Sequence, residues 1–135
     1  MTSRKPYSLG KTERLKSRKQ IDFLFEKGNK IGQFPFRLLY RIESGKGEMK
    51  AGFTVSSKNF PRAVDRNRIK RLSREGYRLQ KRDLEMAVME NKRQLHLFFI
   101  YTGKEIFSYN EISARLKQVL EKLIRIVHET HSEIT

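Results

Sequence analysis

The sequence predicts an α+β fold, namely a two-layer α/β sandwich with the element order α-β-β-(β)-α-β-α, in which the bracketed strand is optional. Three segments place apolar residues at the 3.6-residue spacing of amphipathic helices, and three others show the alternation or the short apolar run of strands. The two kinds of segment alternate along the chain. A two-layer sandwich is the simplest arrangement in which all of them bury their apolar faces.

The first helix is predicted between Ser17 and Gly28. Ser17 and Gln20 form a capping box, whose side chains satisfy free amides at a helix start. Gly28 is a typical residue just past a helix end. The segment between them has one apolar face, formed by Ile21, Leu24 and Phe25.

Three strands are predicted. Residues 34–42 alternate between apolar and other residues, and residues 49–55 alternate again after the turn signal at 44–47, which together indicate a hairpin. Residues 95–101 are apolar on both faces, as in a central strand. The apolar face of the first strand carries Phe34, Phe36, Leu38, Tyr40 and Ile42.

Two more helices follow from periodicity and capping. The first of them runs from about residue 64 to 81, and the second starts at a capping box of Ser108 with Glu111 and continues to about residue 131. Residues 82–94 carry mixed charges and either extend the basic helix or form a loop. We expect a basic N-terminal arm over residues 1–16, one domain over 17–131 and a C-terminal tail over 132–135. The basic residues of the arm are Arg4, Lys5, Lys11, Arg14 and Lys16.

The charge of the chain indicates its class of partner. Lys and Arg number 30 against 15 Asp and Glu, which gives a net charge of +15. Such an excess favours RNA or DNA over an anionic membrane surface or a merely solubilising role. The sequence has no cysteine, which excludes disulfides and thiolate metal sites and fits a reducing cytoplasm. It also has no long apolar run and no apolar core of a signal peptide, so we expect no membrane association.

The predicted helix at 64–81 concentrates this charge. Its apolar arc contains Ile69, Leu72, Gly76 and Leu79, and its opposite arc is basic. Guanidinium groups bind phosphate oxygens bidentately and stay charged at physiological pH, so a nucleic acid is the expected ligand. A plain solvated helix face is the alternative. We expect Arg78 and Lys81 to be peripheral, and the phosphate-contacting candidates are Arg66, Asn67, Arg68, Lys70, Arg71, Arg74 and Arg78.

For two residues of this basic row, the sequence leaves the role or the degree of burial open. Asn67 is uncharged but both donates and accepts hydrogen bonds, so it either contacts a sugar edge or braces the helix start. Arg68 lies near the edge of the apolar arc and is expected to be partly buried. Lys58, in the loop before the helix, is a further candidate for RNA contact.

The stretch GFTVSSKNFPRAVDRNRIKRLSREGYRL, residues 52–79, resembles the signature of the bacterial ribonuclease P protein subunit. The shared core is R-N-R-I-K-R-L-x-R, here from Arg66 to Arg74. The resemblance implies a left-handed βαβ crossover, contrary to the usual right-handed rule. It also implies partnership with a catalytic RNA that removes the 5′ leader of precursor tRNA, with the basic helix facing that RNA and Mg²⁺ held by the RNA. No cofactor or small-molecule substrate is expected on the protein.

The family also implies a cleft between the first helix and the sheet that holds the single-stranded leader. Carried over to this chain, the cleft residues are Phe25, Tyr40 and Ile21, the last standing where the family often has an aromatic residue. Aromatic platforms beside basic grooves are typical of single-strand binding. From the residues alone, an aromatic on an alternating strand is more often part of the core.

No catalytic site is predicted within this chain. Its three histidines are His96, His128 and His131, and none belongs to a carboxylate cluster with metal-ligand spacing. Asp65, next to the basic row, is expected to cap the helix. The expected function is therefore that of the protein subunit of an RNA-based endoribonuclease. The alternatives are a structural RNA-binding protein, such as a small ribosomal protein, and a nuclease acting alone.

Overall fold

A computed structural model describes the backbone of residues 13–134 and the side chains of residues 13–129. It contains helices and strands in the order α-β-β-β-α-α-β-α, which confirms the predicted α+β class. The elements are α1 (Arg18–Lys27), β1 (Asn29–Gln33), β2 (Phe36–Ser44), β3 (Met49–Val55), α2 (Ala63–Gln80), α3 (Arg82–Glu90), β4 (Arg93–Tyr101) and α4 (Tyr109–Ile134).

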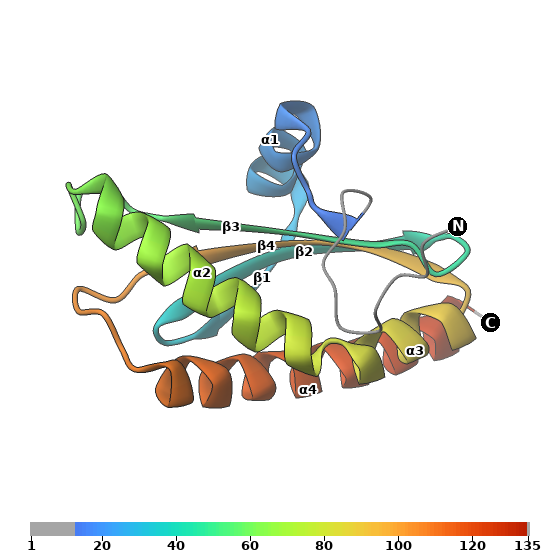
Figure 1. The fold of residues 1–135 in the computed structure, drawn as a ribbon. Coiled ribbons are helices and arrows are strands. Elements are labelled where there is room, and N and C mark those ends of the chain that lie inside the picture. The colour runs from blue at the N-terminus through green and yellow to red at the C-terminus, as the bar shows by residue number, and fades with distance from the viewer. Residues whose placement is uncertain (1–12, 135) are drawn as a thin grey trace, which may run out of the picture.

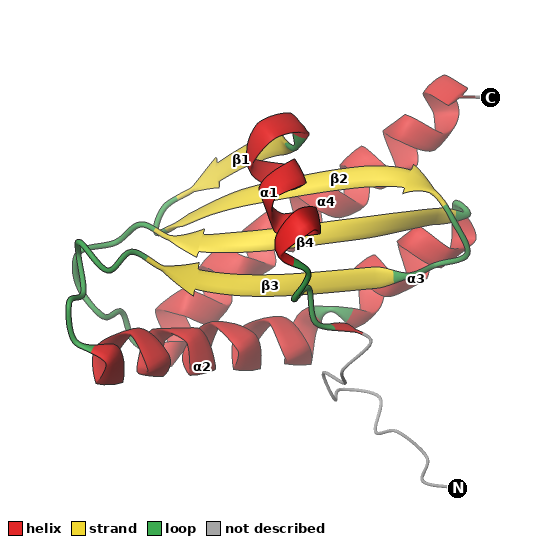
Figure 2. Cartoon of the chain, turned by 90° about the horizontal axis from the view of Figure 1, so that it is seen from above, coloured by secondary structure: helices red, strands yellow, loops and turns green. Residues whose placement is uncertain are grey.

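The four strands form one sheet with helices on both faces. The strand order is β1-β2-β4-β3, and β3 runs parallel to β4 while the other pairs are antiparallel. Helices α2, α3 and α4 cover one face, and among the described elements α1 is the helix on the other face (Figure 1). In Figure 2, β3 and β4 point the same way and the helices that connect them lie behind the sheet. This arrangement makes the β3-α2-α3-β4 crossover left-handed, as the resemblance implies.

The sheet separates two apolar clusters. The larger cluster lies between the sheet and helices α2, α3 and α4, and includes Leu38, Tyr40 and Phe99. The smaller cluster lies under α1, where Leu24 packs with Leu39 and other buried residues. Successive residues of a strand point to opposite faces, so the central strands β2 and β4 supply both clusters.

Helix α2 packs through a narrow seam. Ile69, Ser73, Gly76 and Tyr77 are its buried residues. A Cβ at Gly76 would lie 2.8 Å from Cδ1 of Leu116, so glycine permits the close approach of α2 and α4. The hydroxyl of Ser73 donates to the carbonyl oxygen of Ile69 at 2.8 Å, which satisfies this polar group inside the seam. The seam fixes which side of α2 faces solvent.

The structure corrects several details of the predicted elements. The predicted hairpin of residues 34–42 with 49–55 is wrong, because β4 lies between β2 and β3. Strand β1 fills the place of the optional strand, but its residues were not identified as a strand, and residues 34 and 35, which were assigned to a strand, form the turn between β1 and β2. Residues 82–90 form the separate helix α3. Lys81 is not peripheral, because its side chain is 1% exposed and its Nζ lies 2.8 Å from Oε2 of Glu13. Leu79, expected on the apolar arc, is 43% exposed.

The domain boundaries can be compared only within the described residues. Most of the expected basic arm, including Arg4, Lys5 and Lys11, lies outside them. Helix α4 continues to Ile134, so it takes in residues 132–134 that were expected to form a tail. Lys92, just before β4, has a φ of 52°, a left-handed conformation that is uncommon outside glycine.

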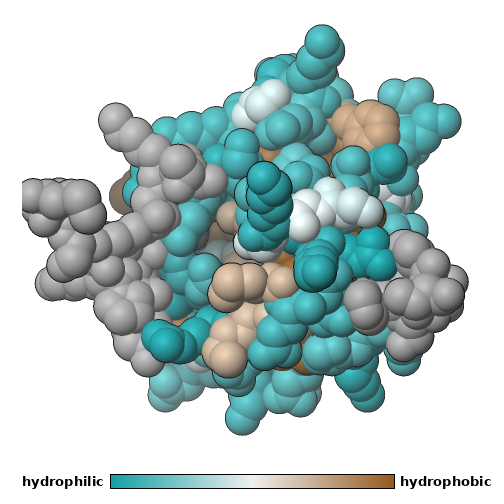
Figure 3. All heavy atoms as spheres, turned by 90° about the vertical axis from the view of Figure 1, so that its right-hand side faces the viewer, coloured by the Kyte–Doolittle hydropathy of each residue, from teal (hydrophilic) through white to brown (hydrophobic). Residues whose placement is uncertain are grey.

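The end of the molecule near the C-terminal part of α3 has a mainly hydrophilic surface with a small apolar patch (Figure 3). Met86 and Met89 of α3 are exposed to 46% and 60%. A patch of this limited kind is ordinary on a soluble surface and needs no partner.

We predict that Gly76→Val lowers the free energy of unfolding by about 1–3 kcal/mol, because the added methyl groups overpack the α2–α4 contact. The measurement is urea unfolding followed by circular dichroism. Gly32→Ala is the matched control, since a Cβ there meets nothing within 4 Å, and its effect should stay within about 0.5 kcal/mol. Equal effects of the two substitutions would show that the seam is not tightly packed.

Candidate nucleic-acid interface

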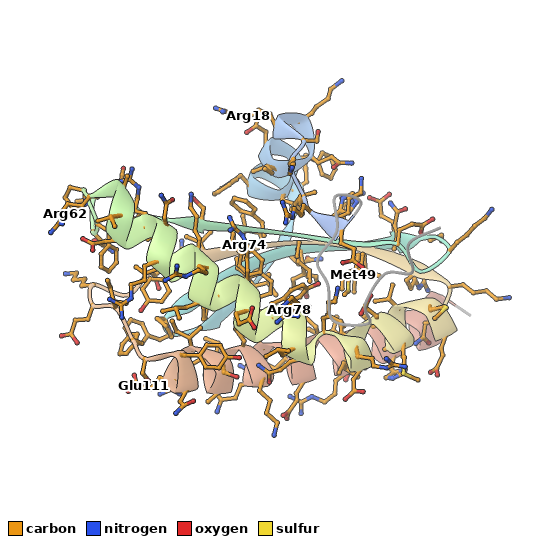
Figure 4. All side chains as sticks on the ribbon, in the orientation of Figure 1. Arg18, Met49, Arg62, Arg74, Arg78 and Glu111 are labelled. Atoms are coloured by element: carbon orange, nitrogen blue, oxygen red, sulfur yellow. The ribbon has the colours of Figure 1, made fainter. Side chains whose placement is uncertain are left out.

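The exposed side of α2 carries a row of cations. Asn67, Arg68, Arg71 and Arg74 are exposed, and Lys70 is half-buried. All five line one groove together with Arg62, Val64 and Asp65. Figure 4 shows Arg62 at the N-terminal end of α2 and Arg74 further along the same helix. The row therefore presents one continuous basic surface, opposite the buried seam.

Arg66 has a different role from its neighbours. Its Nη1 donates to the carbonyl oxygens of Phe60 at 2.9 Å and Pro61 at 2.7 Å. These bonds tie the loop before α2 to the first turn of the helix. In this structure Arg66 therefore braces the loop, although its place in the motif predicts a phosphate ligand.

Arg78 has an acidic partner. Its Nε donates to Oε2 of Glu75 at 3.2 Å, and the two side chains also form an ion pair through Nη2. The pKa of Arg78 is raised, chiefly by this hydrogen bond. The pair reduces the charge that Arg78 offers to a ligand.

Lys58 is exposed in the loop that leads into α2. The loop is held by the buried ring of Phe60 and by a hydrogen bond from Nδ2 of Asn59 to the carbonyl oxygen of Thr102 at 3.4 Å. Lys58 is thus presented from an anchored loop, at the end of the molecule where α2 begins.

A second surface lies on the other face of the sheet, beside α1. Phe23 and Phe25 are exposed to 40% and 52%, although both are aromatic. Phe25 contacts the ring of Phe98 edge-on, with centroids 5.7 Å apart. The guanidinium carbon of Arg41 lies 4.5 Å from the centroid of the Phe23 ring, a cation–π distance. Each exposed ring is therefore held by a side chain from the sheet.

A cleft runs between α1 and the sheet on this face. Its lining includes Gln20 and Phe23 from α1, and Arg41, Gln94 and His96 from the strands. Burial lowers the pKa of His96, and the positive charges of Lys50 and Arg41 add to this effect more than the charge of Glu43 opposes it. The ring is therefore mainly neutral at pH 7. The cations in the cleft lining are Lys19 and Arg41, and Nε of Arg41 donates to Oε1 of Glu43 at 2.8 Å.

The three residues expected in the cleft do not line it. Phe25 is exposed on α1 and packs against Phe98, and Ile21 is half-buried against the smaller cluster. The placement of Tyr40 in the cleft is wrong. Its ring belongs to the larger cluster on the opposite face, where burial raises its pKa. Because side chains alternate along β2, it is Leu39 that faces α1.

Sequence reasoning missed Phe23, Arg41 and His96. The first two carried a detectable signal, since Phe23 lies off the apolar arc of its helix and Arg41 lies on the polar side of its strand. His96 lay in a run that is apolar on both sides, where periodicity does not identify the open face.

The described residues contain no metal site and no membrane span. Among the side chains of residues 13–129, no three or more acidic or histidine side chains group in a way that would hold a metal ion. In the same part of the chain, no helix combines the length and the apolar character needed to cross a bilayer.

Comparisons with known proteins agree with one another. The family model described as Ribonuclease P matches residues 9–124. A ribonuclease P protein component from Porphyromonas gingivalis is 34% identical over 131 residues, covering 93% of this chain and 91% of the relative. One from Escherichia coli is 41% identical over 112 residues, covering 83% and 84%.

Solved structures show the same fold. The RNase P protein from Thermotoga maritima aligns with a TM-score of 0.65 at 23% identity, over 82% of this chain and 96% of that one. The Staphylococcus aureus RNase P protein aligns with a TM-score of 0.58 at 22% identity, over 82% and 94%. With the family model and the curated relatives, these findings establish that the chain belongs to the bacterial ribonuclease P protein family, whose members are subunits of the endoribonuclease that processes the 5′ leader of precursor tRNA.

Proposed function

We propose that the exposed side of α2 binds the catalytic RNA of ribonuclease P, while the cleft beside α1 holds the leader of precursor tRNA. The observation that carries the first half is the joint exposure of Arg68, Arg71 and Arg74 on the side of α2 opposite its buried seam. Fixed guanidinium groups on one helix bind phosphates and release counterions from the RNA. Lys58 and Lys70 extend this surface.

In this proposal the chemistry belongs to the RNA. The RNA holds the Mg²⁺ ions, which would activate the water and stabilise the charge that develops at the scissile phosphate. The protein contributes binding and alignment: α2 neutralises phosphates of the catalytic RNA, and the cleft places the substrate strand. We place the complex in the cytoplasm, which the cysteine-free sequence fits.

The cleft has the properties that a single RNA strand requires. Phe23 offers an exposed ring in the cleft with Arg41 beside it, and Phe25 offers a second exposed ring on the same helix, next to Phe98. Stacking on aromatic rings tolerates any base, so this side of the sheet would accept leaders of different sequence. Ile21 is half-buried in the apolar cluster under α1. Tyr40 takes no part, because it faces the other side of the sheet.

Reconstitution tests the assignment as a whole. The protein is mixed with precursor tRNA at low Mg²⁺, with and without the cognate catalytic RNA. We expect cleavage at the mature 5′ end only when the RNA is present, and faster cleavage when the protein is added. Cleavage by the protein alone would identify an independent nuclease, and a lack of stimulation would favour a structural RNA-binding protein.

Arg71→Ala and Arg66→Ala should have different effects. Arg71→Ala removes a phosphate contact, so we expect affinity for the catalytic RNA to fall by about 1.5–3 kcal/mol. The slope of log K against log salt should flatten by about 1. Arg66→Ala removes two bonds to loop carbonyls, so we expect unfolding free energy to fall by about 1–3 kcal/mol. Filter binding and thermal melting measure the two quantities.

The control for this pair is Arg125→Ala, which removes an exposed arginine from α4. It should leave the stability unchanged and have little effect on RNA affinity. If Arg125→Ala weakens RNA binding as much as Arg71→Ala, the affinity reflects net charge rather than the α2 surface.

Phe25→Ala should weaken binding of precursor tRNA to the assembled enzyme by about 1–3 kcal/mol, because a stacking platform is lost. Binding of mature tRNA, which has no leader, should not change. Phe34→Ala is the matched control, since Phe34 is 61% exposed but packs edge-on against Phe107, away from α1. Unchanged precursor affinity in Phe25→Ala would contradict the cleft assignment.

A further inference from the structure

A buried ion pair links two distant parts of the chain. The Nζ of Lys81 lies 2.8 Å from Oε2 of Glu13, and the side chains are 1% and 20% exposed. Lys81 follows α2, while Glu13 precedes α1. Burying the Lys81 charge costs desolvation energy that its attraction to the partly exposed Glu13 has to offset, so the pair is weak evidence for stability. Its clear structural effect is to join the two segments of chain that carry it.

The ion pair holds Glu13 at one end of the segment 13–15, and Leu15 at the other end is also held in place. The amide of Leu15 donates to the carbonyl oxygen of Ala51 at 3.0 Å, at the edge of β3. The side chain of Leu15 is 4% exposed and belongs to the smaller cluster. Arg14 lies between these anchors and is itself exposed. Its backbone is thus restrained on both sides, although it lies outside the helices and strands.

Gly52 supports this close contact of the segment with β3. A Cβ at this position would lie 3.0 Å from the carbonyl oxygen of Leu15 and 2.9 Å from Cδ1 of Phe98. A side chain at position 52 would therefore push the segment outward. The lack of a side chain at Gly52 therefore allows the segment to pack against the edge of β3.

Arg14 meets the basic surface of α2. One pocket is lined by Arg14 together with Arg71, Arg74, Glu75 and Arg78. Arg71 and Arg74 also line the groove along α2, so the pocket continues that surface. The carboxylate in the lining of this pocket, that of Glu75, accepts a hydrogen bond from Arg78. Figure 4 shows Arg74 and Arg78 on neighbouring turns of α2.

We propose that Arg14, Arg71 and Arg74 form a phosphate-binding site for the backbone of the catalytic RNA, and that the buried Glu13–Lys81 ion pair positions Arg14 in it. The inference rests on the proposed function and adds a site to it. Two guanidinium forks on α2 and one from the segment before α1 converge on one pocket, which suits the several oxygens of a phosphate. The shared lining with the α2 groove assigns the phosphate to the catalytic RNA rather than to the leader.

The first test is Arg14→Ala. We expect affinity for the catalytic RNA to fall about five- to tenfold. The salt slope should flatten by about 1, as for loss of one phosphate contact. The melting temperature should not change, because the guanidinium is exposed. Loss of precursor tRNA affinity with unchanged affinity for the catalytic RNA would overturn the assignment.

The second test uses the sign of the charge. Glu13→Gln makes the protein more positive, so long-range electrostatics alone would strengthen binding to RNA. If the ion pair positions Arg14, binding should instead weaken, by about threefold. Glu121→Gln is the matched control, since it makes the same charge change on the exposed side of α4. It should leave the RNA affinity equal or slightly higher.

A double variant separates positioning from folding. Glu13→Gln combined with Lys81→Met removes the buried charge that a single substitution would leave, so the fold should be retained. The weaker RNA binding should persist in it. Wild-type affinity in the double variant, or tighter binding in Glu13→Gln, would overturn the inference. Arg68→Ala run in parallel tests the proposed function separately, because Arg68 lines the α2 groove but not the pocket of Arg14. If Arg68→Ala does not weaken binding to the catalytic RNA, the α2 surface itself is not the RNA-binding surface.

Discussion

The seam of α2 is the constraint on which the interface depends. Ile69, Gly76 and Tyr77 are fully or almost fully buried against the sheet and α4, and burying one large apolar side chain contributes about 1.5–3 kcal/mol. This packing fixes the rotation of the helix about its axis. At 100° per residue, fixing three positions determines where every other side chain points. The cations face outward because the apolar seam faces inward.

The sheet keeps the two proposed RNA contacts apart. Helices α2, α3 and α4 cover one face, and α1 covers only part of the other (Figures 1 and 2). Because side chains alternate along β2, Tyr40 lies in the larger cluster and Leu39 faces α1. At the edge of β3, Arg14 and Arg74 also line a recess with Lys16 and Gly52, and this recess shares no residue with the cleft beside α1. In the proposed function, catalytic RNA and leader would therefore not compete for the same side chains.

Features with strong local signals were predictable from the sequence. The capping box of α1, the basic and apolar arcs of α2 and the apolar run of β4 all give elements that the structure confirms. Strand β1 reads NKIGQ, with a single large apolar residue, so it gives no alternation. Its strand conformation comes from pairing with β2.

The remaining errors involve contacts between residues far apart in sequence or burial on both faces. Leu38, Leu39 and Tyr40 are all buried, so apolarity did not reveal which of them faces α1. Lys81 pairs with a residue 68 positions away, and no periodicity signals such a pair. Arg66 matches the family motif as well as its neighbours do, yet it bonds to loop carbonyls. A motif identifies residue types, whereas the fold determines their partners.

The position of α2 against the catalytic RNA can be tested directly. Since the sequence contains no cysteine, a single introduced cysteine can carry a photo-crosslinker. Val64→Cys lies in the α2 groove without replacing a cation, and Glu129→Cys lies exposed near the far end of α4. We expect crosslinks to the catalytic RNA from position 64 and few from position 129. The reverse pattern, or equal crosslinking from both positions, would show that the exposed side of α2 does not face the RNA.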